Sequence, residues 1–144
     1  MAVFLLKGLN GADYQPPGCT GVFSDVPCPG LFTDWVEAVA QAGIIAPCYA
    51  DHFCPNLTVT RSDMAEFLLK AAYGSSYTPP PAVGIFGDVP KTNPRAPWIE
   101  ELNRRAITVG CNADPLLYCP DSPNNRGQMA VFIDKTFELQ LYRP

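Results

Sequence analysis

Apolar residues follow helical spacing in two kinds of segment, one led by a tryptophan and the other by a methionine. In both, most apolar positions fall three or four residues apart, as on the buried face of an amphipathic helix. The first face comprises Trp35, Val36, Val39 and Ala42, and the second comprises Met64, Phe67, Leu68 and Ala71. Thr33 and Thr60 are expected to be the N-caps, with Asp63 completing a capping box at Thr60. The pattern predicts an opening helix, a loop and a closing helix.

This two-helix pattern occurs twice. The segment Phe-Ser-Asp-Val-Pro at 23–27 recurs as Phe-Gly-Asp-Val-Pro at 86–90, and at the same offset Trp35 recurs as Trp98. After a two-residue insertion, the closing helix at 60–70 recurs at 125–135, with Asn125 and Gln128 at the capping positions. Residues 1–7 match residues 64–70 at six of seven positions. We therefore predict the closing helix of a preceding repeat at 1–13 and complete repeats at 14–76 and 77–144.

Proline-rich stretches lie between each closing helix and the repeat that follows. They span residues 14–18 and 74–81 and are expected to be semi-extended linkers. Met1 occupies the ordinary methionine position of a closing helix, so it need not be an initiator. We expect the chain to be a mature or internal piece of a longer precursor.

Six cysteines place the chain in an oxidising compartment: Cys19, Cys28, Cys48, Cys54, Cys111 and Cys119. Zinc ligands and a reactive thiol are the alternatives. Zinc sites favour Cys pairs separated by two to four residues, whereas the gaps here are wider and the chain has one histidine, His52. Equivalent positions within the two repeats predict Cys48–Cys54 and Cys111–Cys119. Cys19 and Cys28 are replaced together in the second repeat, by Ala82 and Lys91, which predicts that they pair with each other.

Composition excludes several classes of protein. Hydrophobic residues make up 47% and charged residues 17%, which allows a packed core. The net charge of −4 argues against nucleic-acid binding, which normally requires a basic face. No apolar run approaches the roughly 20 residues that span a bilayer, and Lys and Arg are too scattered for a polybasic membrane patch. We expect neither a nucleic-acid partner nor membrane insertion.

Catalytic patterns are also missing from the sequence. A nucleophile usually needs a histidine base, but His52 has no counterpart in the second repeat. No Gly-x-Ser-x-Gly motif or phosphate-binding glycine loop occurs. Glu100 and Glu101 are adjacent on a predicted helix, so their side chains should point in different directions. We expect a protein that is not an enzyme.

The ordered set of motifs resembles the S-layer homology domain. An Asp-Val segment, a Trp-led helix, an Asp-bearing loop ending in proline and a Thr-Arg before the second helix occur in this order. They occupy 23–27, 35–44, 48–55 and 60–70, and in the second copy 86–90, 98–107, 111–120 and 125–135. The resemblance implies a mostly α fold, with helix–loop–helix repeats around a pseudo-threefold core. It also implies a role on the bacterial envelope, often through cell-wall polysaccharide bound between modules.

Candidate ligand residues recur in both repeats: Arg61, Arg126, Asp25, Asp88, Trp35 and Trp98. Guanidinium groups suit carboxylates or phosphates, and tryptophans stack on sugars. Each also has a structural interpretation: the arginines as solvated or paired, the aspartates as caps of the following turn and the tryptophans as core. Asp51 and Asp114 lie in oxygen-rich loops that are weak candidates for calcium. No other cofactor is expected.

Two hypotheses follow for function. The first is a secreted structural subunit of a bacterial surface layer or filament that joins copies of itself head to tail. The apolar helix at 1–9 should dock either in a threefold core of this chain or on a neighbouring subunit. Phe137, Leu139, Leu141 and Tyr142 would supply a second apolar surface for contact between subunits. The alternative is a carbohydrate-binding anchor that holds a surface protein on cell-wall polysaccharide.

The closing helices are expected to form a shared core. Their equivalent methionines and phenylalanines should be buried together, with Trp35 and Trp98 packed against them. These residues are Met1, Met64, Met129, Phe4, Phe67 and Phe132.

Overall fold

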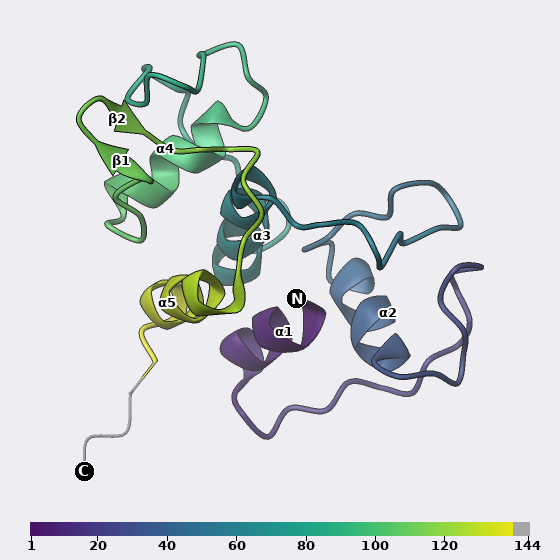
Figure 1. Cartoon of the computed structure of the whole chain (residues 1–144). Coiled ribbons are helices and arrows are strands. Elements are labelled where there is room, and N and C mark those ends of the chain that lie inside the picture. Colours follow the sequence, from purple (N-terminus) through teal and green to yellow (C-terminus); the bar gives the residue numbers. More distant parts are fainter. Residues whose placement is uncertain (140–144) are drawn as a thin grey trace. The chain divides into compact units, whose positions relative to one another are not determined.

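The computed structural model describes residues 1–139, and this part of the chain is mostly helical, as predicted. Its elements are, in order, α1 (Ala2–Asn10), α2 (Thr33–Gln41), α3 (Arg61–Tyr73), α4 (Ala96–Arg104), β1 (Asn112–Ala113), β2 (Leu116–Leu117) and α5 (Arg126–Phe137) (Figure 1). The two short strands pair antiparallel, with Asn112 opposite Leu117. The opening helices α2 and α4 and the closing helices α1, α3 and α5 lie where the two periodicities place them.

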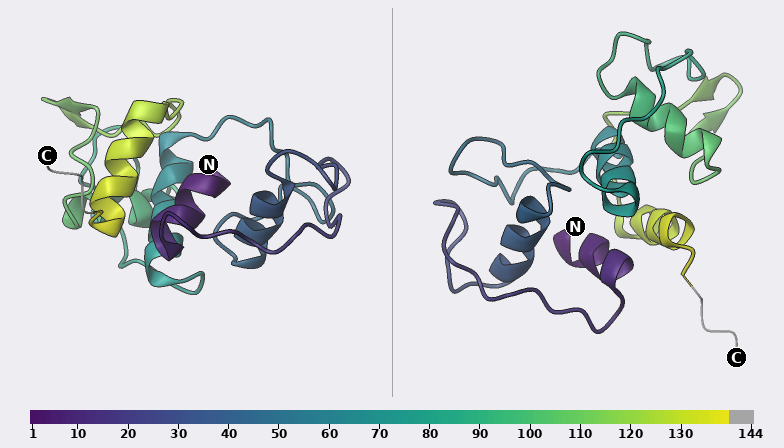
Figure 2. Two further views of the ribbon diagram at one scale, coloured as in Figure 1. Left: turned by 90° about the horizontal axis from the view of Figure 1, so that it is seen from below. Right: turned by 180° about the vertical axis from the view of Figure 1, so that it is seen from behind.

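The chain divides into two compact units, of which the first spans Met1–Leu57 and the second begins at Thr58. In the first unit α1 packs on α2, and in the second α3 packs on both α4 and α5 (Figure 2). The division falls inside the predicted repeat at 14–76, between its opening and closing helices. Each closing helix before the last therefore packs on the opening helix of the following repeat. The pseudo-threefold arrangement of repeats stays a prediction.

Two of the three predicted N-caps are confirmed. The Thr60 hydroxyl accepts a hydrogen bond from the Asp63 N–H, and an Asp63 oxygen accepts one from the Thr60 N–H at 2.8 Å. Asn125 and Gln128 form the same capping box on α5. The prediction for Thr33 is wrong, because its hydroxyl donates to the Pro27 carbonyl at 2.7 Å and the N-cap of α2 is Phe32.

Each unit has an aromatic pair between its Asp-Val-Pro segment and its disulfide loop. Phe23 and Phe53 have ring centroids 5.5 Å apart, and Phe86 and Tyr118 have theirs 5.4 Å apart. Phe23 also belongs to a buried cluster in the first unit. The two pairs occupy equivalent positions in the repeats and tie each opening segment to its loop.

The predicted core of closing-helix residues is correct only in part. Met64 and Phe132 are buried, but Met1, Met129 and Phe67 are only partly buried, and Phe4 is 42% exposed. The prediction for Phe4 is wrong because the buried face of α1 consists of Ala2, Leu5 and Leu6. Leu5 and Leu6 belong to a six-residue apolar run, so spacing alone does not fix which side of the helix is buried. Trp35 and Trp98 are partly buried.

Within residues 1–139, no helix combines the length and apolar character that crossing a bilayer requires. Of the proposed C-terminal apolar surface, Phe137 is partly buried and Leu139 is 42% exposed. Leu141 and Tyr142 lie outside the described residues.

Candidate functional site

Three disulfides fix the loops of the two units. They join Cys19 to Cys28, Cys48 to Cys54 and Cys111 to Cys119, each with a Cα–Cα distance of 6.0 Å. This is the pairing that the sequence predicts. Three disulfides in a chain of 144 residues indicate an oxidising compartment.

The aspartates of the Asp-Val-Pro segments hold the disulfide loops. The Asp25 carboxylate accepts hydrogen bonds from the N–H groups of Phe53 and Cys54, at 2.9 and 2.7 Å. Asp88 accepts the equivalent bonds from Tyr118 and Cys119, at 2.8 and 2.7 Å. Burial tends to raise the pKa of Asp25, but the two backbone hydrogen bonds outweigh it and lower that pKa. Both oxygens of each carboxylate are therefore engaged by a distant loop of the chain, and not by the adjacent turn that the sequence suggested.

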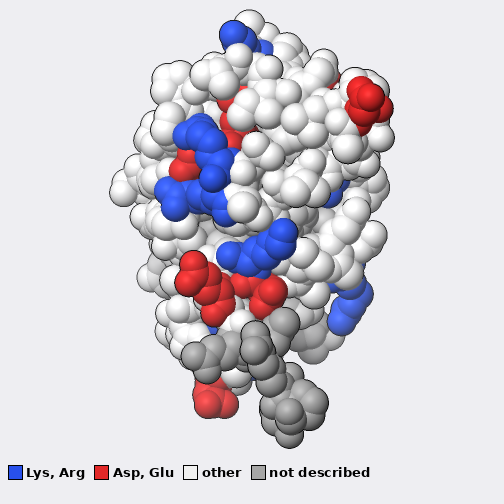
Figure 3. All heavy atoms as spheres, turned by 90° about the vertical axis from the view of Figure 1, so that its left-hand side faces the viewer, with Lys and Arg blue, Asp and Glu red and all other residues white. Residues whose placement is uncertain are grey.

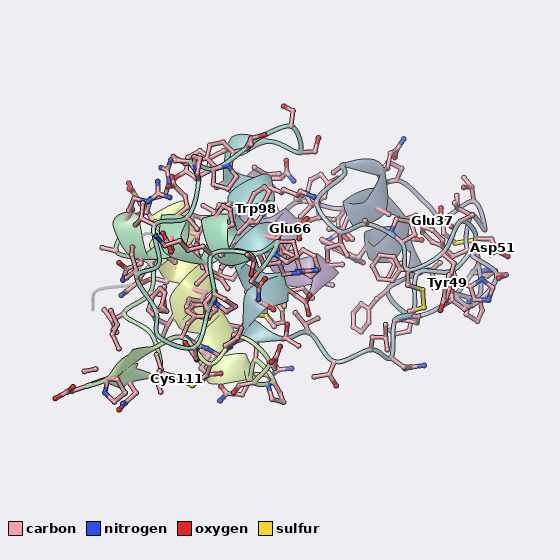
Figure 4. All side chains as sticks on the ribbon, turned by 90° about the horizontal axis from the view of Figure 1, so that it is seen from above. Glu37, Tyr49, Asp51, Glu66, Trp98 and Cys111 are labelled. Carbon is pink, nitrogen blue, oxygen red and sulfur yellow. A yellow bond between two sulfur atoms is a disulfide. The ribbon has the colours of Figure 1, made fainter. Side chains whose placement is uncertain are left out.

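Glu37 and Glu100 play a second recurring role, which was not predicted from the sequence. Glu37 accepts hydrogen bonds from three consecutive backbone N–H groups, those of Thr20, Gly21 and Val22 (Figure 4). Glu100 accepts from the equivalent groups of Val83, Gly84 and Ile85, at 2.7–3.1 Å. Each glutamate thereby fixes the segment that follows a proline-rich linker onto an opening helix. The available signal was the recurrence of glutamate two residues after each tryptophan.

Glu100 and Glu101 differ in their partners, as their adjacent helix positions predict. Glu101 pairs with Arg105 at 2.7 Å and with Arg104 at 2.5 Å, and it accepts a hydrogen bond from the Tyr77 hydroxyl. On the face drawn in Figure 3, Lys and Arg side chains form small clusters beside Asp and Glu side chains.

Arg61 is buried inside the second unit, with only 5% of its surface exposed. Its Nε donates to the Tyr118 carbonyl at 2.9 Å, and the Tyr118 hydroxyl donates back to the Arg61 carbonyl at 2.8 Å. The guanidinium carbon lies 4.8 Å from the centroid of the Tyr118 ring and 5.5 Å from that of Phe132. Burial raises the pKa of Tyr118, which keeps the phenol protonated and able to donate. Arg61 thus joins α3, the Cys111–Cys119 loop and α5.

Arg126 occupies a different environment from Arg61. It is exposed and forms the first residue of α5, directly after the N-cap Asn125. The two arginines that match in sequence are therefore not equivalent in the structure. They do not provide the pair of equal ligand pockets that an anchoring role would favour.

Trp35 and Trp98, in contrast, have matching surroundings. The Trp35 ring packs edge-on against Tyr14 at 5.9 Å, and the ring of Trp98, labelled in Figure 4, packs against Tyr77 at 6.2 Å. A lysine of the preceding closing helix lies 5.7 Å from the ring centroid in each case, Lys7 for Trp35 and Lys70 for Trp98. These two aromatic pairs are the recurring, partly exposed feature that is best suited to contact a sugar ring.

The two calcium candidates are not alike. Asp51 bonds to His52 at 2.8 Å and also accepts from the Ser24 hydroxyl (Figure 4). The hydrogen bond from His52 lowers the pKa of Asp51, and the same bond raises the pKa of His52. Asp114 is exposed between β1 and β2. Asp51 therefore has an internal partner, and the two residues belong to different units.

The second unit has a pocket of about 560 Å³ beside its disulfide. Its lining residues are Asp88, Cys119, Pro120, Asp121, Ser122 and Pro123. Asp88 also lies near Cys111 and Cys119 at distances that would suit a metal. These cysteines are bonded to each other, so they offer no thiolate to an ion. Of the predicted ligand residues, only Asp88 lines this pocket.

No protein-family model matches this chain, and no curated protein matches its sequence. Its function must be inferred from its own residues.

Stability should fall with acid because of Glu37 and Glu100. Burial tends to raise the pKa of Glu100, but bonds from three backbone N–H groups lower it below its ordinary value of 4.5, and Glu37 behaves alike. A carboxyl whose pKa is lower in the folded state stabilises the fold above its unfolded value and loses this contribution as pH falls through the folded value. The urea midpoint should therefore drop below about pH 4.5, and Glu100→Gln should lessen this drop. An equal drop in both proteins would contradict the role of Glu100.

Proposed function

We propose that this chain is a non-catalytic subunit of a bacterial surface layer or filament that assembles with copies of itself. In this proposal the chain is exported, and its S-layer-homology-like repeats surround a pseudo-threefold helical core. The observation that carries it is the pair Leu31 and Phe32, whose surfaces are 85% and 55% exposed. Leu31 lies three residues after Cys28, and Phe32 is the N-cap of α2. Adjacent exposed apolar side chains favour burial against a partner.

The corresponding site in the second unit is polar. Pro94 and Arg95 occupy the positions that match Leu31 and Phe32 in the second repeat. Arg95 forms ion pairs with Asp63 at 2.8 Å and with Glu66 at 3.3 Å. Because the second unit lacks this surface, the two ends of a subunit differ in what they offer a neighbour. In this proposal the pair contacts an unlike surface of the next subunit, and unlike contacts that do not close produce filaments or layers.

The disulfides and the recurring bonds fit a structural role. The carboxylate bonds of Asp25 and Glu37 recur in Asp88 and Glu100, so both units use the same internal fixings. Short disulfide loops add about 2–3 kcal/mol each against unfolding. Subunits outside a cell benefit from this resistance, because they are exposed to proteases and changing conditions.

The alternative is a carbohydrate-binding anchor, and the matching Trp–Tyr pairs favour it. Tyr14–Trp35 and Tyr77–Trp98 would offer two equal stacking surfaces for a cell-wall polysaccharide. Against it, Arg61 is buried and Arg126 is exposed. The assembly proposal does not depend on equal pockets and is therefore preferred.

Assembly should be lost when the exposed pair is made polar. We expect the double variant Leu31→Ser, Phe32→Asn to form no polymer, as measured by light scattering and electron microscopy. Its melting temperature should change little, because surface substitutions usually alter stability by about 0.5 kcal/mol or less. Asparagine suits position 32, which has a left-handed backbone with φ 64° and is the N-cap of α2. A deletion of the predicted joint at residues 1–9 would be a less specific test, because it would also remove the packing of α1 on α2.

The matched control is Gln41→Ser, an exposed change on the same unit, which should polymerise like the parent protein. Undiminished polymer from the double variant would show that this surface is not the joint. A parent protein that stays monomeric at high concentration and binds cell-wall polysaccharide would favour the anchor. In that case Trp35→Ala and Trp98→Ala should each weaken the binding.

A further inference from the structure

The disulfide loops Cys48–Cys54 and Cys111–Cys119 are each followed by a turn of the same type, at residues 54–57 and 119–122. The Leu57 N–H donates to the Cys54 carbonyl at 3.1 Å, and the Ser122 N–H donates to the Cys119 carbonyl at 3.2 Å. Both cysteines have a left-handed backbone, with φ of 60° and 58°, and each is followed by proline. The third residue is Asn56 in the first turn and Asp121 in the second. The two turns therefore share one backbone conformation but differ in the side chain at their third position.

The second turn is held against α3, whereas the first is not. The carbonyls of Pro120 and Ser122 accept hydrogen bonds from the N–H groups of Ser62 and Arg61, both at 3.0 Å. Within the described residues, residues 55–57 form no backbone hydrogen bond other than the one that closes their own turn. Residues 55–58 are all exposed, and Leu57 has 68% of its surface in solvent. The turn at residues 54–57 is therefore accessible from solvent to an enzyme that modifies side chains.

Asn56 differs from the other exposed asparagines of the described chain. The Nδ2 groups of Asn10 and Asn112 donate to the carbonyls of Leu6 and Pro115, and the Oδ1 of Asn125 accepts from an N–H of α5. The side chains of Asn56 and Thr58 form no hydrogen bond within residues 1–139. Asn56 is also the asparagine that is followed two residues later by a threonine or serine, with leucine between. This is the acceptor sequence for N-linked glycans, which are attached to surface loops of secreted proteins.

We propose that Asn56 carries an N-linked glycan. The donor would be an oligosaccharide joined through its anomeric carbon to a lipid diphosphate. The Nδ2 of Asn56 attacks that carbon, so that a C–N bond forms while the bond from carbon to the diphosphate oxygen breaks. The lipid diphosphate leaves with the electron pair, and Nδ2 releases one of its two protons. The free Thr58 hydroxyl is the group by which the transferase selects this asparagine. Export to an oxidising compartment, which the disulfides indicate, brings the chain to such enzymes.

The test is peptide mapping by mass spectrometry of the native protein from its source. The peptide containing Asn56 should carry hexose or hexosamine mass, and enzymatic release of the glycan should leave aspartate at position 56. Expressed in the same source, Thr58→Ser should keep the glycan because the hydroxyl remains. Thr58→Val and Asn56→Gln should lose it completely. Both positions are exposed, so the variants should fold.

An unmodified Asn56 peptide in the native protein would overturn the proposal. So would a glycan confined to another residue, such as Thr78 in the proline-rich linker. A sugar that survives in Thr58→Val would show that attachment does not use the acceptor sequence, which also contradicts it. The outcome is independent of self-assembly, because polymer and monomer alike can be mapped.

Discussion

Glu100→Ala should lower the free energy of unfolding of the second unit by about 1–3 kcal/mol. Glu100 has 1% of its surface exposed and accepts hydrogen bonds from the backbone N–H groups of residues 83–85. Removal of a buried partner costs about 1–3 kcal/mol for each group left unsatisfied. The measurement is urea unfolding in a Trp35→Phe background, where the fluorescence of Trp98 reports the second unit. Glu100→Gln keeps one acceptor oxygen and should lose less, so it remains informative if the alanine variant does not fold.

The matched control is Glu37→Ala, which removes the same three bonds from the first unit. Glu37 is only partly buried, whereas Glu100 is fully buried, so water can replace the Glu37 carboxylate more easily. We expect a loss of about 1 kcal/mol, read from Trp35 in a Trp98→Phe background. Equal losses of unfolding free energy at the two sites would mean that burial does not determine how much these glutamate hydrogen bonds contribute to stability.

Features that depend on near neighbours in sequence could be predicted. The helices follow from apolar spacing, and the capping boxes at Thr60 and Asn125 need residues only three positions apart. The disulfides were predictable because bonded cysteines lie six to nine residues apart and are kept or lost together between repeats. Local chemistry and the recurrence of sequence motifs were therefore enough to predict the helices, two capping boxes and the three disulfides.

Features that depend on distant partners could not be predicted. Arg61 is buried because Tyr118, 57 residues away, surrounds it with its ring, carbonyl and hydroxyl. Glu37 and Glu100 bond to backbone N–H groups 15–17 residues away, which every non-proline residue has. Their donors therefore leave no mark in the sequence. Only the recurrence of a polar residue at the same place in both repeats indicates such a role.

The largest packing effect should come from the closing helices, where equivalent residues differ in burial. Phe132 is 5% exposed and packs beneath the Arg61 guanidinium, whereas the equivalent Phe4 is 42% exposed. Truncation of a buried phenylalanine to alanine costs about 3–5 kcal/mol. Phe132→Ala should lose this much, plus the attraction between ring and cation, in a urea titration of the second unit.

Phe4→Ala tests whether the loss of unfolding free energy depends on the position in the repeat or on the burial of the side chain. Much of the Phe4 ring already lies in water, so its truncation removes less apolar surface and should cost about 1 kcal/mol. A difference of about 2 kcal/mol or more corresponds to several degrees in melting temperature for a chain of this size. Phe132→Leu refines the comparison, because it keeps apolar volume but removes the ring that faces Arg61. If Phe132→Leu is as damaging as Phe132→Ala, the contact with the arginine matters more than the volume. If Phe4→Ala and Phe132→Ala cost the same, the position of α1 in the first unit differs from the one described.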